Sequence, residues 1–232
     1  MEIDLNADLG EGAGHDAALM AILTSANICC GHHAGSEAIS RETIALAKRA
    51  NLSIGAHPGY PDREQFGRRE QPHSEDAYIE MALVQILTLI QYADDAQMQI
   101  KYVKPHGAWY NQACRDPDVA RPLVEVCASL DLPLVGLPGS QLERCAKEAS
   151  VPFFAEGFVD RRYRADGSLV PRSEPNAQIE DPAEAIVQLD WLIRERGVRT
   201  ICIHSDSPHA LTFATKVREA IIVRGHTMKA FV

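Results

Sequence analysis

The chain opens with Met1-Glu-Ile-Asp-Leu-Asn-Ala-Asp-Leu-Gly-Glu-Gly12, and this stretch decides which fold we expect. Its side chains alternate between apolar and polar: Ile3, Leu5 and Ala7 are apolar, whereas Asp4, Asn6 and Asp8 are polar. A period of two predicts a β-strand, and the two glycines that follow predict a tight turn. An unpaired buried polar group costs about 1–3 kcal/mol, so Asn6, Asp8 and Glu11 near the end of a strand indicate a site. A half-exposed edge strand with a polar outer face is the alternative interpretation.

The length and composition of the chain narrow the class of protein. Its 232 residues are 46% hydrophobic and 24% charged, which is typical of a globular protein, and we expect one domain over residues 1–232. The net charge of −9 argues against nucleic acid and anionic membranes as partners, because both attract basic surfaces. No apolar run reaches the ~18 residues of a membrane span and no signal peptide is recognisable, so we expect a cytoplasmic protein. The six cysteines show no C-x-x-C spacing, which favours reduced core thiols.

Short apolar segments alternate with helical segments along the rest of the chain. Strands are predicted at residues 25–31, 52–56, 100–103, 134–137, 153–155 and 200–203. Helices are predicted at residues 16–23, after Ser36, and at 74–96, 116–130, 141–149, 181–197 and 207–225. This alternation predicts a parallel sheet covered by helices, either an open doubly wound sheet or a closed β/α barrel. We favour the closed barrel, because no G-x-G-x-x-G follows the first strand and polar strand ends recur along the whole chain.

Polar side chains stand where the predicted strands end. They are Asp8, His32, His33, His57, Lys104, His106, Glu156, His204 and Asp206. The carboxyl ends of the strands of a parallel β/α barrel meet at one face, where the loops build the active site, so we expect these side chains to gather there. Such a cluster can hold a metal, transfer protons or bind a carboxylate substrate.

A metal is the most specific of these three interpretations. One carboxylate with two or three imidazoles is a common set of ligands for a catalytic zinc or iron-group ion with an open position for water. The candidate ligands are Asp8, His33, His57 and His106. No H-x-x-H or H-E-x-x-H spacing fixes their geometry, so a metal-free network of imidazoles oriented by carboxylates is the alternative.

Cations in the same regions favour an anionic substrate. Lys104 stands between a predicted strand and Pro105-His106-Gly107, so its amine is expected to point into the barrel mouth, where it can neutralise a carboxylate or a developing oxyanion. Four arginines on the predicted loops can clamp a carboxylate or phosphoryl group, although each alone is also explained as a solvated loop charge: Arg63, Arg68, Arg161 and Arg172.

Two common catalytic motifs are missing from the sequence. There is no G-x-S-x-G, and no G-x-x-x-x-G-K-[ST] to bind nucleotide phosphates. If the reaction uses a nucleotide, another subunit or a different kind of site must bind it.

Several motifs, in order from one end of the chain to the other, resemble those of the LamB/YcsF family, the family of the bacterial 5-oxoprolinase A-subunit. They lie at residues 4–12 (DLNADLGEG), 25–28 (SANI), 30–31 (CG), 33–35 (HAG), 54–58 (IGAHP), 61–64 (PDRE), 66–68 (FGR), 103–107 (VKPHG), 110–111 (YN), 166–173 (DGSLVPRS) and 209–211 (HAL). The resemblance implies a distorted seven-stranded parallel β/α barrel of the deacetylase type. It also implies a share in the ATP-dependent hydrolysis of 5-oxo-L-proline to L-glutamate, together with partner subunits B and C that bind the ATP.

On this interpretation the site residues fall into two groups, with a divalent metal such as zinc as a further cofactor. The candidate catalytic residues are Asp8, Lys104, His106, His204 and Asp206. The candidate substrate-binding residues are Asn6, Glu11, Arg63, Arg68, Glu156 and Arg172. Asp8 or a histidine is expected to serve as general base to water, and Lys104 with His106 to stabilise the oxyanion.

The chain departs from the family pattern at two places, which leaves other functions open. The family reads C-G-F-H-A-G-D where this chain has His32 and Ser36, and H-G-D-G where it has Ser205 and Ser207. A different substrate range or metal is therefore possible. The alternatives are a stand-alone metal-dependent deacetylase of sugar-like or N-acyl substrates and a non-catalytic scaffold subunit.

Overall fold

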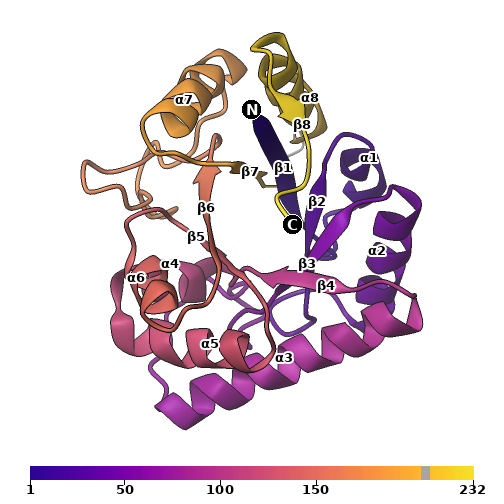
Figure 1. The fold of residues 1–232 in the computed structure, drawn as a ribbon, viewed down its shortest axis with the longest axis vertical. Helices are drawn as coiled ribbons and strands as arrows, with labels where there is room; N and C mark the ends of the chain where they lie inside the picture. Colours follow the sequence, from indigo (N-terminus) through magenta and orange to yellow (C-terminus); the bar gives the residue numbers. More distant parts are fainter. Residues whose placement is uncertain (205–209) are drawn as a thin grey trace.

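The computed structural model describes residues 1–204 and 210–232, in which seven parallel strands form a closed barrel (Figure 1). The strands follow one another round the ring in sequence order, and β1 closes it by pairing with both β7 and β2. They are β1 (Glu2–Leu9), β2 (Ser25–Cys29), β3 (Ser53–His57), β4 (Ile100–Val103), β5 (Leu134–Gly136), β6 (Phe153–Phe158) and β7 (Thr200–Ile203). The predicted seven-stranded β/α barrel is confirmed.

Helices surround the ring of strands (Figure 1). They are α1 (Asp16–Met20), α2 (Glu37–Arg49), α3 (Glu75–Asp95), α4 (Gly107–Arg115), α5 (Pro117–Ser129), α6 (Gln141–Glu148), α7 (Pro182–Arg194) and α8 (Ala210–Val223). Three of them begin after a serine whose hydroxyl accepts a backbone N–H of the first turn, namely Ser36, Ser74 and Ser140. No helix in the described part of the chain is long and apolar enough to cross a membrane.

The helix α4 is absent from the sequence-based prediction. It begins directly after His106, whose side chain makes no capping hydrogen bond, so the usual signal of a helix start is missing. This helix matters for the site because it begins directly after His106 and forms part of the wall of the cavity.

The inner face of β1 is polar along its whole length. Ile3, Leu5, Ala7 and Leu9 are buried in the hydrophobic core, while the residues between them belong to a buried hydrogen-bonded network. In that network Asp4 accepts hydrogen bonds from Thr24, Ser25 and Thr200. Every polar side chain of this strand that enters the barrel therefore has partners, which is what the cost of burying an unpaired polar group demands.

The structure places Glu156 deeper than the sequence suggests. The predicted strand ends beside it, but β6 continues to Phe158, and Glu156 lies opposite Thr200 of β7 with its side chain fully buried. Its carboxylate accepts a hydrogen bond from the side-chain amide of Asn6 at 3.3 Å. Glu156 is therefore part of the interior network.

The C-terminal segment covers the amino end of the barrel. The short strand β8 (Thr227–Met228) pairs with the start of β1 outside the ring, and the chain then crosses the ring, where Figure 1 places its end. The ring of Phe231 packs on Tyr102 and Phe154 at centroid distances of 4.8 and 4.7 Å. This end of the barrel is consequently filled by aromatic side chains.

Candidate active site

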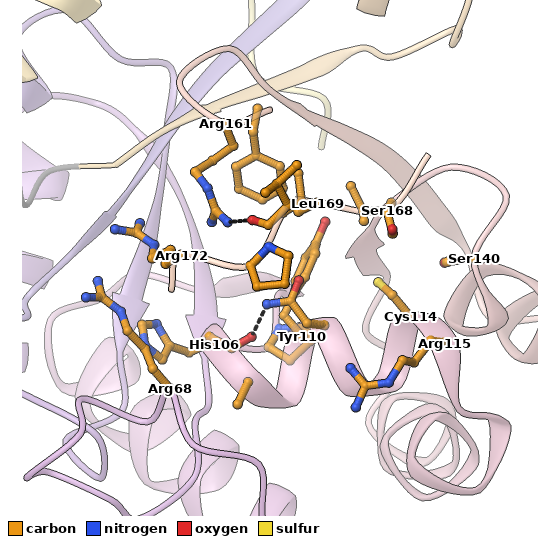
Figure 2. Close-up of a pocket in the computed structure, with 18 of the residues that line it drawn as sticks. Arg68, His106, Tyr110, Cys114, Arg115, Ser140, Arg161, Ser168, Leu169 and Arg172 are labelled. Carbon is orange, nitrogen blue, oxygen red and sulfur yellow. Dashed lines mark hydrogen bonds between the residues drawn. The ribbon is translucent and has the colours of Figure 1, made fainter. Parts of the chain in front are cut away.

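A cavity of about 630 Å³ opens where the strands end (Figure 2). Six of the side chains expected at the strand ends or in the turn after β1 line it: Asp8, Glu11, His57, Lys104, His106 and His204. Five arginines also line it: Arg68, Arg115, Arg161, Arg164 and Arg172. Groups far apart in the sequence thus gather at one mouth of the barrel.

Four side chains from separate loops and strand ends present possible ligand atoms to one point. A carboxylate oxygen of Glu11 and one ring nitrogen each of His33, His57 and His106 lie within 4.8 Å of one another. The Glu11 Oε1 atom is 3.1 Å from His33 Nε2 and 3.2 Å from His106 Nδ1. The three histidines are at most 5% exposed. One carboxylate with three imidazoles is a set that binds zinc and iron-group ions, so this group can hold a divalent metal.

Backbone carbonyls determine which ring nitrogen of two histidines carries the hydrogen. His57 Nδ1 lies 2.7 Å from the carbonyl oxygen of Lys104, and His106 Nε2 lies 2.9 Å from that of Phe66. A carbonyl can only accept, so these nitrogens donate, and the other nitrogen of each neutral ring carries a lone pair. Those two nitrogens, His57 Nε2 and His106 Nδ1, are only 3.0 Å apart. Two facing lone pairs need a proton or a metal cation between them.

The remaining two members of the group are held in the charge states that bind metal. Burial and the neighbouring His106 lower the pKa of His33 to about 3, and the two rings are stacked with centroids 3.8 Å apart. Burial alone would raise the pKa of Glu11, but the imidazoles of His106 and His33 next to its carboxylate outweigh this effect, so the pKa of Glu11 is lowered. A neutral imidazole and an ionised carboxylate are the ligand forms at neutral pH.

Two glycines allow the loop after β3 to lie directly on the histidines. A Cβ atom at Gly59 would stand 2.4 Å from His33 Nδ1, and one at Gly67 would stand 2.8 Å from His33 Cβ. Gly67 also has a φ of +63°, which other residues rarely adopt. Any larger residue at these positions would displace the His33 ring.

Lys104 is the centre of a second buried cluster next to the histidines. Its Nζ lies 3.0 Å from Asp8 Oδ1, 2.9 Å from Glu156 Oε1 and 3.0 Å from Cys202 Sγ. Burial alone would lower the pKa of Lys104, but the charge of Asp8 and of the other partners outweighs it and holds this pKa well above its usual value. Asp8 links the two clusters, because its other oxygen is 3.3 Å from His57 Nε2. The lysine is therefore a permanent cation beside the histidine group.

The two carboxyl groups on this lysine titrate very differently. Burial would raise the pKa of Asp8, but His57 and Lys104 outweigh it, so this pKa lies well below its usual value. Burial dominates at Glu156 despite Lys104 and raises its pKa to about 7. Asp8 is thus ionised near pH 7, while Glu156 exchanges a proton in that range.

Replacing Glu156 with glutamine is expected to remove a pH-dependent part of the stability. Glu156 has a pKa of about 7 when folded against 4.5 when unfolded, so it favours the folded state below pH 4.5 and loses this contribution as the pH rises to 7. The free energy of unfolding of the wild type relative to Glu156→Gln should fall by up to about 3 kcal/mol between these pH values. Urea unfolding of both proteins at several pH values measures this difference, and a difference independent of pH would contradict the assignment.

An aspartate and a histidine form a pair next to the end of β7. His204 Nδ1 lies 2.8 Å from Asp160 Oδ2, and the same oxygen accepts the backbone N–H of His204 at 2.8 Å. A carboxylate at Nδ1 fixes the tautomer and leaves Nε2 of the neutral ring with a lone pair. His204 lines the cavity and packs in parallel on Phe158, so its ring is held in one orientation.

The sequence matches one known protein family over almost its whole length. A model of the LamB/YcsF family matches residues 3–232. This chain belongs to the LamB/YcsF family. Proteins of Neisseria meningitidis serogroup C (strain 053442) and serogroup B (strain ATCC BAA-335 / MC58), each named as the A-subunit of 5-oxoprolinase, are 42% identical to it over 243 residues, with 99% of each chain covered.

Solved structures share the LamB/YcsF barrel. The lactam utilization protein of Thermus thermophilus is 39% identical, with a TM-score of 0.91 and both chains fully covered. The catalytic domain of a peptidoglycan N-acetylglucosamine deacetylase from Eubacterium rectale covers 100% of this chain, and 88% of that domain is covered, with a TM-score of 0.56. At 10% identity the latter likeness concerns the fold alone.

The other candidate residues of this LamB/YcsF member lie in different places. Asn6 is in the barrel interior, where its amide donates to Thr200 Oγ1 at 2.7 Å. Arg63 lies outside the cavity lining and binds the carbonyl oxygens of Gly31 and Gly35. Arg68 and Arg172 line the cavity, and Figure 2 shows them on the side of His106. Asp206, together with Ser205 and Ser207, lies outside the described residues.

The structure arranges several candidate residues of this LamB/YcsF member differently from what the sequence suggests. Glu11 is expected to bind substrate, but the structure places it among the histidines, while Asp8 of the predicted metal set lies against Lys104. Asp160 and Cys202 contact His204 and Lys104, and neither is among the candidates of the sequence analysis. The position of Cys202 on an inward-facing strand is visible in the sequence, but a lone cysteine there is more typical of a core residue.

Proposed function

We propose that this chain is the hydrolytic subunit of an ATP-dependent 5-oxoprolinase that opens the ring of 5-oxo-L-proline to give L-glutamate. The observation that carries the proposal is the convergence of Glu11, His33, His57 and His106 at a cavity whose wall also contains Lys104 and His204. The names of the relatives from Neisseria meningitidis and Thermus thermophilus, a 5-oxoprolinase subunit and a lactam utilization protein, support the substrate class. ATP is bound by partner subunits B and C in this proposal.

The histidine group fits a divalent metal such as zinc. In the neutral rings, the facing nitrogens of His57 and His106 have no hydrogen between them. The N–H group on the other nitrogen of each ring donates to a backbone carbonyl, as in most metal-ligating histidines. Glu11, His33, His57 and His106 would hold the ion. When bound, it supplies a Lewis acid that polarises the lactam carbonyl and lowers the pKa of water.

The residues of the chain supply the proton transfers and the charge. His204 accepts a proton from the attacking water at Nε2 and passes it to the ring nitrogen, while Asp160 stabilises the charged imidazole. The oxygen–carbon bond forms, the carbon–nitrogen bond of the lactam breaks, and the nitrogen leaves as the amine of glutamate. Lys104 places a fixed positive charge next to the developing oxyanion.

Glutamate release tests this proposal. With ATP and the partner subunits, the wild type should release glutamate from 5-oxo-L-proline, and His204→Gln should lower kcat by about 100-fold or more, since a general acid–base contributes 10²–10⁴-fold. The exposed His15 gives a matched control, and His15→Ala should keep the wild-type rate. Full activity of His204→Gln would leave this chain a scaffold role only.

A further inference from the structure

One arginine of the cavity differs from the others in how its charge is balanced. Arg115 pairs with Glu70 and Arg164 pairs with Glu174. Arg161 instead donates to the carbonyl oxygens of Val170 at 2.6 Å and Ala177 at 3.4 Å. In residues 1–204 and 210–232, no carboxylate lies within the 4.0 Å of an ion pair with it.

The environment of Arg161 makes its uncompensated charge unfavourable. The residue is only 4% exposed, yet its side chain lines the cavity. Burial and the positive charge of Arg172 lower the pKa of Arg161 to about 10, and the nearby charge of Asp160 offsets only part of this effect. Buried guanidinium groups in proteins are normally paired with an anion, so the missing partner is expected to come from a ligand.

We propose that Arg161, with Arg68 and Arg172, forms a subsite for an anionic oxygen group of the substrate, either a carboxylate or a phosphoryl group. Figure 2 shows Arg68 and Arg172 beside His106 and Arg161 above them in the view. The planar fork of an arginine matches both groups, because each offers two oxygens to parallel N–H donors. This inference rests on the proposed function and names the chemistry by which the site selects its substrate.

The subsite is directly connected to the histidine group. The guanidinium of Arg68 stacks on the ring of Phe66 at 4.8 Å, and the carbonyl of Phe66 holds His106. An anion bound by Arg68 therefore lies next to the loop that holds His106. 5-Oxo-L-proline has this form, with a carboxylate close to its lactam carbonyl, whereas the neutral amides of sugars lack the anion.

Binding to the full chain, without ATP or partners, tests the subsite. Titration calorimetry with 5-oxo-L-proline, inorganic phosphate and the neutral lactam 2-pyrrolidinone separates the two anions from the ring itself. Wild type should bind at least one of the anions, and Arg161→Gln should weaken that binding at least about tenfold, the loss expected for a charge-assisted hydrogen bond. Binding of 5-oxo-L-proline that depends on Arg161 assigns the subsite to the carboxylate, and binding of phosphate assigns it to a phosphoryl group.

Two further variants keep the test decisive. Arg164→Gln, in the same loop and cavity but at an arginine already paired with Glu174, should bind as the wild type does. Arg172→Gln should weaken anion binding, and it replaces Arg161→Gln if circular dichroism shows that the latter is unfolded. Anion binding unchanged in both Arg161→Gln and Arg172→Gln, no binding of either anion to the wild type, or 2-pyrrolidinone binding as tightly as 5-oxo-L-proline would overturn the inference.

This outcome is separable from that of the proposed function. Binding that depends on Arg161 without glutamate release in the complete system would support the subsite and refute the 5-oxoprolinase. Glutamate release that is unaffected by Arg161→Gln would support the 5-oxoprolinase and refute the subsite.

Discussion

Replacing Lys104 with methionine is expected to abolish glutamate release and to destabilise the barrel by about 3–5 kcal/mol. The amine is 1% exposed and lies 3.0 Å from Asp8 and 2.9 Å from Glu156. Methionine leaves these carboxyl groups buried without their cation, which is the costly way of breaking a buried ion pair. Activity is lost because the oxyanion then faces carboxylates instead of an ammonium group.

The same strand offers a matched control for this substitution. Lys101 of β4 is exposed and donates to the side chain of Gln99, so Lys101→Met should change neither the midpoint of urea unfolding nor the rate. A single Lys104→Met variant as stable as the wild type would show that the ammonium does not hold this cluster together.

Replacing His106 with alanine is expected to lower the affinity for zinc at least about 100-fold and to remove activity with it, since loss of even an outer partner of a metal site costs 10–100-fold. His106 contributes one of the four converging ligand atoms and also fixes Glu11, 3.2 Å from its Nδ1. Competition with a chromophoric chelator measures the affinity, and elemental analysis of purified protein gives the metal content.

The pH dependence of metal binding supplies an independent check. His33 has a pKa of about 3, so protons should compete for this ligand only under acid conditions, and zinc affinity should stay high down to about pH 5 as far as His33 is concerned. The control His15→Ala should retain the wild-type metal content. The wild type could instead contain no stoichiometric metal and lose no activity on treatment with chelator. In that case a shared proton, and not a metal, lies between His57 and His106.

The architecture could be predicted because the deciding information is periodic. The alternation in residues 1–9 and the recurrence of strand, polar end and helix are properties of the chain that do not depend on tertiary contacts. The gathering of His57, His106 and His204 then follows from the geometry of any parallel barrel. These features can be recognised in the amino-acid sequence by itself.

The choice among similar side chains could not be predicted, because it depends on depth and loop path. Asp8 and Glu11 are both carboxylates near the end of β1. The turn through Gly10 places Glu11 among three histidines and leaves Asp8 between His57 and Lys104. Arg63 and Arg161 likewise look alike in the sequence, yet one binds loop carbonyls outside the cavity and the other lies buried in its wall. Partner distances of a few ångströms are not encoded in local patterns.

The packing of Phe231 on Tyr102 and Phe154 limits the path by which substrate and product enter and leave the barrel. Because aromatic rings fill the amino end of the barrel, substrate and product must enter and leave through the same opening. This opening is the cavity where the strands end, which the arginines border. In the proposed reaction, a partner subunit that binds around this opening would have to leave room for glutamate to depart. Turnover in the complete assembly is therefore expected to depend on how often that contact opens.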